Sequence, residues 1–204
     1  MLLLLFYYSY IMRPLLIYIH GFLSSSLSAK AQETRHYLEQ QALPIEFVAP
    51  ELSNYPLTAY QQLLQVIESQ PLRKIGLIGS SLGGFMATAL AEQYGLRAVL
   101  VNPAVNPHKL IAGFLGEQFN PYTEQHFVLD QRHVQQLQRL QVQRITQPAN
   151  IKVLLQTGDE TLDYRQAVSY YQGCLQVVEQ GGDHRFQHFD QHLAQAIEFL
   201  TLLD

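Results

Sequence analysis

The chain has 204 residues, a length that suits one domain with a substantial core. Hydrophobic residues make up 48% of it, as in globular proteins, while the formal net charge is -4 and no basic stripe is present. Nucleic-acid binding therefore has no electrostatic support. The single cysteine, Cys174, excludes an internal disulfide framework and fits a reducing compartment, so a cytoplasmic protein is expected.

The first residues form an apolar and aromatic run, Leu2 to Ile11. This run is far shorter than the ~20 residues of a membrane span, and it lacks the basic segment and small-residue cleavage site of a signal peptide. Met12-Arg13-Pro14 then leads into the first strand. We expect translation to start at Met12, with residues 1–12 a non-native or disordered extension; an edge strand or an interfacial anchor is the alternative.

After Arg13, strand-like and helix-like runs alternate. The apolar runs that predict strands are 15–19, 46–49, 74–78, 97–101, 151–156 and 175–178. The helical patterns cover 27–41, 58–69, 81–93 and 193–203. This alternation predicts a single α/β domain over residues 13–204. Its doubly wound, mostly parallel sheet would have about six strands, helices on both faces and a functional site at the carboxyl ends of the strands.

The first predicted strand ends in His20-Gly21-Phe22. In serine hydrolases of the α/β type, a His-Gly pair at this place opens the loop whose backbone N–H binds the oxyanion. We expect the N–H groups of Phe22 and Leu82 to form the oxyanion hole, with His20 and Gly21 beside the substrate. His20 also suits a structural histidine at a strand end, and it is not the expected base.

The third predicted strand leads into Gly79-Ser80-Ser81-Leu82-Gly83-Gly84 and then into a helical run. Gly-x-Ser-x-Gly on a strand–turn–helix is typical of a nucleophilic serine, here Ser81. The helix would direct free N–H groups and the positive end of its dipole at the site. A phosphate-binding loop would need a following lysine, and a dinucleotide fingerprint would order its glycines differently. A plain packing turn is the remaining alternative.

The stretch from 102 to 150 contributes no strand to the predicted sheet. Residues 120–123 resemble a turn and 130–140 a helix, and residues from about 105 to 147 predict a short cap inserted over the site. We expect Leu110, Phe114 and Leu115 to line the acyl pocket beneath it. A surface excursion with its own small core is the alternative.

A carboxylate is expected after the fifth predicted strand, since the acid of an α/β-type triad follows the nucleophile in the chain. Asp159 lies nearest to the end of that strand and is the preferred candidate. Asp163 is the second candidate, although it suits the N-cap of a helix that starts at Tyr164, and Glu160 is the third.

The base is expected after the last strand, where a glycine-rich loop carries His184 toward the closing helix. His188 and His192 are its rivals. They lie four residues apart on one helix face, and no glutamate lies between them in a His-Glu-x-x-His zinc pattern. A solvated helix face is the simpler interpretation of this pair, so no metal site is predicted.

Five segments in this order resemble the α/β-hydrolase superfamily and, more closely, the small YqiA-type bacterial esterases. They are residues 19–22, 79–84, 100–104, 156–160 and 182–184, which span nearly the whole chain after Arg13. The resemblance implies a cytosolic esterase that acts on acyl esters or thioesters, with Ser81, Asp159 and His184 as its triad. Larger relatives have two leading strands and a large lid that this sequence lacks.

The sequence therefore predicts a serine hydrolase that cleaves carboxylic esters of short to medium acyl chains through an acyl-enzyme. It would need no metal or cofactor, and its partner would be a small-molecule ester or thioester. An acyl-CoA thioesterase would use the same residues. A non-catalytic α/β-hydrolase-like binding protein is the alternative from another class, and such a protein would usually lack a member of the triad.

Overall fold

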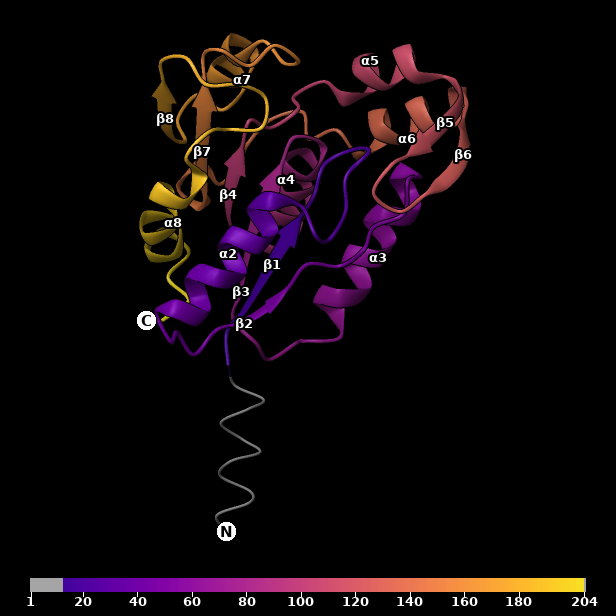
Figure 1. The fold of residues 1–204 in the computed structure, drawn as a ribbon. Helices are drawn as coiled ribbons and strands as arrows, with labels where there is room; N and C mark the ends of the chain where they lie inside the picture. The colour runs from indigo at the N-terminus through magenta and orange to yellow at the C-terminus, as the bar shows by residue number, and fades with distance from the viewer. Residues whose placement is uncertain (1–12, 204) are drawn as a thin grey trace.

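The computed structural model describes residues 13–203, and the prediction for residues 1–12 lies outside this range. Six strands form one parallel sheet in the order β2-β1-β3-β4-β7-β8. Their bounds are Leu15–Ile19 (β1), Glu46–Val48 (β2), Ile75–Ser80 (β3), Arg97–Val101 (β4), Ile151–Gln156 (β7) and Leu175–Glu179 (β8). The chain winds outward from β1 in both directions, which confirms the predicted doubly wound sheet (Figure 1).

Helices cover both faces of this sheet, because its central strands are apolar on both faces. Every residue of β1, β3 and β7 is buried. Since side chains alternate along a strand, Leu16 and Tyr18 pack with one pair of helices, while Leu15 and Ile17 pack with the helices of the other face. The first pair is α2 (Ala29–Gln40) and α8 (Leu193–Leu200); the other face carries α3 (Pro56–Glu68), α4 (Leu82–Tyr94) and α7 (Tyr164–Tyr170).

Helix α4 occupies the centre of the fold. All its residues from Leu82 to Ala91 are buried, and it ends at Gly95, whose φ of 67° gives a left-handed cap. The backbone N–H and C=O groups of a helix are hydrogen-bonded to each other, so a helix with apolar side chains can lie in the core. Helix α4 packs there against β3 and β4. No helix within residues 13–203 is long and apolar enough to cross a membrane.

The segment between β4 and β7 forms a small unit that we call the insertion. It contains α5 (Pro107–Ile111), the 3₁₀ turn η1 (Ala112–Phe114), the antiparallel strands β5 (Gly116–Asn120) and β6 (Gln125–Leu129), α6 (Gln131–Leu140) and the 3₁₀ turn η2 (Pro148–Asn150). The helix matches the prediction for 130–140, but the β5–β6 hairpin was not predicted. Figure 1 shows the insertion beyond the carboxyl edge of the sheet, with α6 against α3. Its role as a cap stays a prediction.

Candidate active site

Ser81 lies on the sharp turn between β3 and α4. Its backbone has φ 55° and ψ -120°, a conformation that L residues rarely adopt and that costs about 1–3 kcal/mol. Neighbouring segments hold it there. The Ser81 N–H donates to the Val101 carbonyl at 3.0 Å, and the Ala104 N–H donates to the Ser81 carbonyl at 3.0 Å. The end of β4 therefore fixes the turn from one side.

The glycines around Ser81 let α4 approach the sheet closely. A Cβ on Gly79 would lie 2.4 Å from the Gly83 carbonyl oxygen, and a Cβ on Gly83 would lie 2.0 Å from the Ile19 carbonyl oxygen. Both contacts are with backbone, which has little freedom to move. Any larger residue would therefore push the helix that begins at Leu82 away from β1 and β3.

Three side chains from three loops meet at the carboxyl edge of the sheet. His184 Nε2 lies 3.1 Å from Ser81 Oγ, and His184 Nδ1 lies 2.9 and 3.0 Å from the two oxygens of Asp159. A carboxylate only accepts hydrogen bonds, so Nδ1 carries the proton and Nε2 is free to accept the Ser81 hydroxyl. The Asp159 side chain is 2% exposed and that of His184 is 23% exposed.

Backbone groups of its own loop fix the Asp159 carboxylate. Its Oδ1 accepts the N–H of Thr161 at 2.9 Å and that of Leu162 at 2.8 Å. The loop also passes close to the one that carries His184, since a Cβ on Gly158 would lie 2.3 Å from the Gly182 carbonyl oxygen. The acid-bearing and histidine-bearing loops are therefore in direct contact.

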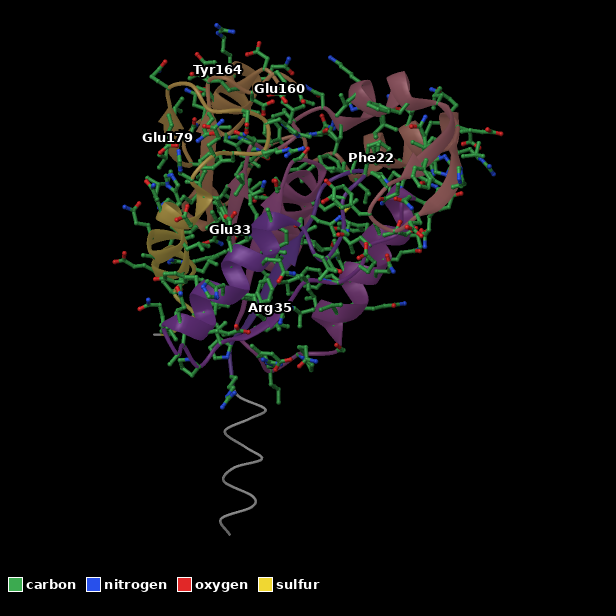
Figure 2. All side chains as sticks on the ribbon, in the orientation of Figure 1. Phe22, Glu33, Arg35, Glu160, Tyr164 and Glu179 are labelled. Atoms are coloured by element: carbon green, nitrogen blue, oxygen red, sulfur yellow. The ribbon has the colours of Figure 1, made fainter. Side chains whose placement is uncertain are left out.

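The rival acids have other partners. Asp163 is the N-cap of α7, as its sequence context suggested, and accepts an N–H of the first helical turn at 3.0 Å. Glu160 accepts the backbone N–H of His184 at 3.0 Å, whereas the ring nitrogens of His184 face Asp159 and Ser81. In Figure 2, Glu160 lies near α7 and Phe22 lies on the loop after β1, both beyond the carboxyl ends of the strands. The structure thus brings Asp159, and neither rival, to the imidazole.

The rival histidines lie away from Ser81. His192 Nε2 lies 3.0 Å from the Glu179 carboxylate, and His188 is an exposed residue with a φ of 60° just before the closing helices. Within residues 13–203, His, Cys, Asp and Glu side chains do not gather in any group of three or more suited to a metal ion. His184 is the histidine that reaches the serine.

The loop after β1 passes directly beside the serine. A Cβ on Gly21 would lie 3.2 Å from Ser81 Cβ. Phe22 and Leu82 line one small pocket of about 20 Å³, which is room for about one water molecule. As the first residue of α4, Leu82 has an N–H without an acceptor inside the helix. The two expected oxyanion-hole residues therefore flank the same small space.

The His20 side chain is buried and bonded to protein groups through both ring nitrogens. Its Nδ1–H donates to the Gly21 carbonyl at 2.9 Å, and its Nε2 accepts the Leu52 N–H at 3.2 Å. The Gly21 carbonyl and the Phe22 N–H belong to the same planar trans peptide and point in opposite directions. The contact between His20 and the Gly21 carbonyl therefore turns the Phe22 N–H away from the His20 ring. Burial lowers the pKa of His20, which favours this neutral form.

Of the three expected acyl-pocket residues, Phe114 contacts Phe22 of the loop after β1. Its ring meets that of Phe22 edge to face, with centroids 5.5 Å apart, and Phe127 of β6 contacts Phe22 in the same way at 6.1 Å. Leu110 instead lines a surface pocket beside the acid-bearing loop, and Leu115 is 43% exposed. The prediction did not include Phe127.

A parallel sheet with a serine on its central strand–helix turn, and with an aspartate and a histidine after the last two strands, defines the α/β-hydrolase fold. Solved structures agree. Alpha/beta hydrolase domain-containing protein 10 from mouse has a TM-score of 0.71 at 18% identity, covering 94% of this chain and 91% of that one. Est1E from Butyrivibrio proteoclasticus with bound ferulic acid has a TM-score of 0.68 at 17% identity, covering 94% and 89%.

The chain belongs to UPF0227, an uncharacterised protein family, whose profile matches residues 15–201. A UPF0227 protein from Serratia proteamaculans (strain 568) is 24% identical over 199 residues, which is 92% of this chain and 99% of the relative. The predicted α/β-hydrolase fold and the predicted resemblance to the YqiA-type family, UPF0227, are confirmed.

Proposed function

We propose that this protein is a serine hydrolase that cleaves carboxylic esters through a covalent acyl-enzyme. The observation that carries the proposal is the 3.1 Å contact between Ser81 Oγ and His184 Nε2, on an imidazole whose other nitrogen lies 2.9 Å from Asp159. The strained backbone of Ser81 supports it as well, because such strain lowers stability and is found mainly where a function retains it.

In the first half-reaction, Ser81 Oγ attacks the carbonyl carbon of the ester while His184 Nε2 takes the hydroxyl proton. The N–H groups of Phe22 and Leu82 stabilise the oxyanion of the tetrahedral intermediate. The intermediate then expels the alcohol, which receives the proton from His184. Asp159 holds the ring in the required tautomer and stabilises the imidazolium.

In the second half-reaction, water attacks the acyl-enzyme with His184 as its base, and the carboxylic acid leaves Ser81. We propose acyl chains of short to medium length, because the sequence lacks the large lid of the bigger relatives. A thioester would follow the same steps with a thiol as the leaving group, so an acyl-CoA thioesterase is the second candidate. A non-catalytic binding protein would have no need of the strained Ser81.

A fluorophosphonate probe tests the proposal, because only an activated serine reacts with it. We expect covalent labelling at Ser81, and we expect Ser81→Ala to lose labelling and to lower ester hydrolysis by roughly 10⁴-fold or more. Ser80→Ala is the matched control, since Ser80 is buried at the end of β3, and it should keep most of the activity. Labelling at Ser80, or none at all, would refute the assignment.

A panel of nitrophenyl esters of increasing acyl length, assayed beside acyl-CoAs, separates the two candidates. We expect turnover to be highest with the shorter acyl chains, because the sequence lacks the large lid of the bigger relatives. Faster turnover of long acyl-CoAs than of any nitrophenyl ester would favour the thioesterase.

A further inference from the structure

The loop that carries His184 has little structure of its own. Residues 180–188, all within the described chain, form turns and bends rather than a helix or strand. A general base must nevertheless stay within hydrogen-bonding distance of its nucleophile. The Asp159 carboxylate holds the ring, but it does not hold the backbone from which the ring extends. Other groups must therefore fix that backbone.

Asn102, the residue after β4, holds the loop at the position of the histidine. It is 2% exposed, and its φ of 41° lies in the left-handed region, which asparagine tolerates better than most residues. Its Nδ2 donates to the carbonyls of Asp183 at 3.0 Å and His184 at 3.3 Å. Its Oδ1 accepts the backbone N–H of Gln156 at 3.0 Å.

Gln156, the last residue of β7, holds the same loop on both sides of the histidine. It is 3% exposed. Its Oε1 accepts the N–H groups of Asp183 at 3.3 Å and Gln187 at 2.8 Å. Its Nε2 donates to the Gln187 carbonyl at 2.9 Å and to the Glu179 carboxylate at 3.0 Å. The two amides together bond five backbone groups of residues 183–187.

We propose that Asn102 and Gln156 are positioning residues for His184, an inference that rests on the proposed function. Amides suit this task because each supplies donors and acceptors without adding a charge near the imidazolium that forms during the reaction. The two amide side chains themselves are almost fully buried, which limits the competition of water for their bonds. Glu160, by contrast, holds the His184 N–H from an exposed position. The buried amides connect the loop directly to the ends of β4 and β7.

Asn102→Gly is the sharpest test, because glycine adopts a positive φ readily, so the side chain and its bonds are removed without straining the backbone. We expect kcat and the rate of fluorophosphonate labelling to fall roughly 10- to 100-fold, as a displacement of about 1 Å would cause, with KM changing much less. Tyr171→Phe is the control. It removes a buried hydrogen bond to Thr88, 2.9 Å long and outside the loop, and should lower stability without slowing labelling.

A double-mutant cycle tests whether Asn102 acts through His184. In a His184→Ala background, Asn102→Gly should cause no further loss of residual activity, because the group it positions is already absent. A loss of equal size in both backgrounds would show a merely structural role and overturn the inference. So would wild-type labelling by the Asn102→Gly variant. Normal activity of His184→Ala alone would instead refute the proposed function.

Asn102→Asp and Gln156→Met provide independent variants with nearly unchanged side-chain volume. Asn102→Asp keeps the acceptor for the Gln156 N–H but turns an oxygen toward the carbonyls of Asp183 and His184, so we expect it to slow labelling at least as much as Asn102→Gly. Gln156→Met should slow labelling as well. Labelling at the wild-type rate in folded forms of both variants would overturn the inference.

Discussion

Close backbone approaches shape the turn around Ser81 at the carboxyl edge of the sheet, whereas side-chain contacts hold the insertion in place. At the edge, parallel strands end side by side, and glycines admit close approaches that no other residue would allow. In the insertion, Asn120 donates to the Ser24 carbonyl at 3.1 Å and to the Asn54 amide at 2.9 Å, and Phe114 packs on Phe22. Changes at the edge should therefore act on catalysis or folding, and changes in the insertion on stability and substrate preference.

The largest expected effect at the edge is that of Asp159→Asn. We expect it to lower kcat by about 10⁴-fold, because the neutral amide no longer orients the correct tautomer of His184. Asp163→Asn is the matched control, since Asp163 caps α7 and should cost at most about 1 kcal/mol of stability. Steady-state kinetics of the two variants decide the matter. An inactive Asp163→Asn beside an active Asp159→Asn would show that the acid is misassigned.

The main sheet and the insertion also differ in how well the sequence predicts them. The six strands of the main sheet, their parallel arrangement and the strand-end positions of Ser81, Asp159 and His184 follow from apolar runs and from the rule that sites lie at carboxyl ends. The contact distances among these side chains agree with that expectation, while their catalytic roles stay predictions.

The hairpin of the insertion could not be predicted in the same way. In β6, the exposed Val128 is as apolar as its buried neighbours Phe127 and Leu129, so the strand shows no alternation of apolar and polar residues. The contact between Phe127 and Phe22 joins residues far apart in the chain, and no local pattern signals it. The anchoring of the His184 loop by Asn102 was missed for the same reason.

A pair of glycine substitutions compares the two regions directly. Gly83→Ala would place a Cβ 2.0 Å from the Ile19 carbonyl oxygen, and we expect it to lower the free energy of unfolding by about 3 kcal/mol or more. A Cβ on Gly113, in the insertion, would meet no atom within 4 Å. Gly113→Ala should therefore change the free energy of unfolding by less than about 0.5 kcal/mol. Urea unfolding of both variants measures the difference. Equal losses would contradict the distinction between the regions.

A smaller effect is expected where the insertion meets the loop after β1. Phe114→Leu removes the edge-to-face contact with Phe22, so we expect a loss of about 1 kcal/mol in stability with kcat nearly unchanged. Phe119→Leu is the control, because Phe119 is 44% exposed on the hairpin and lies outside this contact. A large fall in kcat for Phe114→Leu alone would show that the insertion shapes the chemistry as well.

The smallest expected effect concerns the pH dependence of stability at His20. Burial is the main reason why the pKa of His20 lies below its ordinary value of 6.5, while the hydrogen bond to Gly21 and the Glu51 carboxylate act in the opposite direction. Between the lowered pKa and 6.5, the unfolded chain binds more protons than the folded protein, so the free energy of unfolding rises with pH. This contribution is complete above pH 6.5 and is lost as the pH falls through the lowered pKa.

His20→Gln should therefore flatten the dependence of stability on pH below 6.5, because the titrating ring is gone. Chemical unfolding at a series of pH values measures the slope, and His36→Gln, which removes an exposed histidine of α2, is the matched control. An unchanged slope in His20→Gln would show that the ring titrates alike in the folded and unfolded chain. Protonation of His20 places a hydrogen on Nε2, which then can no longer accept the Leu52 N–H, so this hydrogen bond is lost. Ester hydrolysis should then weaken over the same pH range as the loop that presents the Phe22 N–H loses this support.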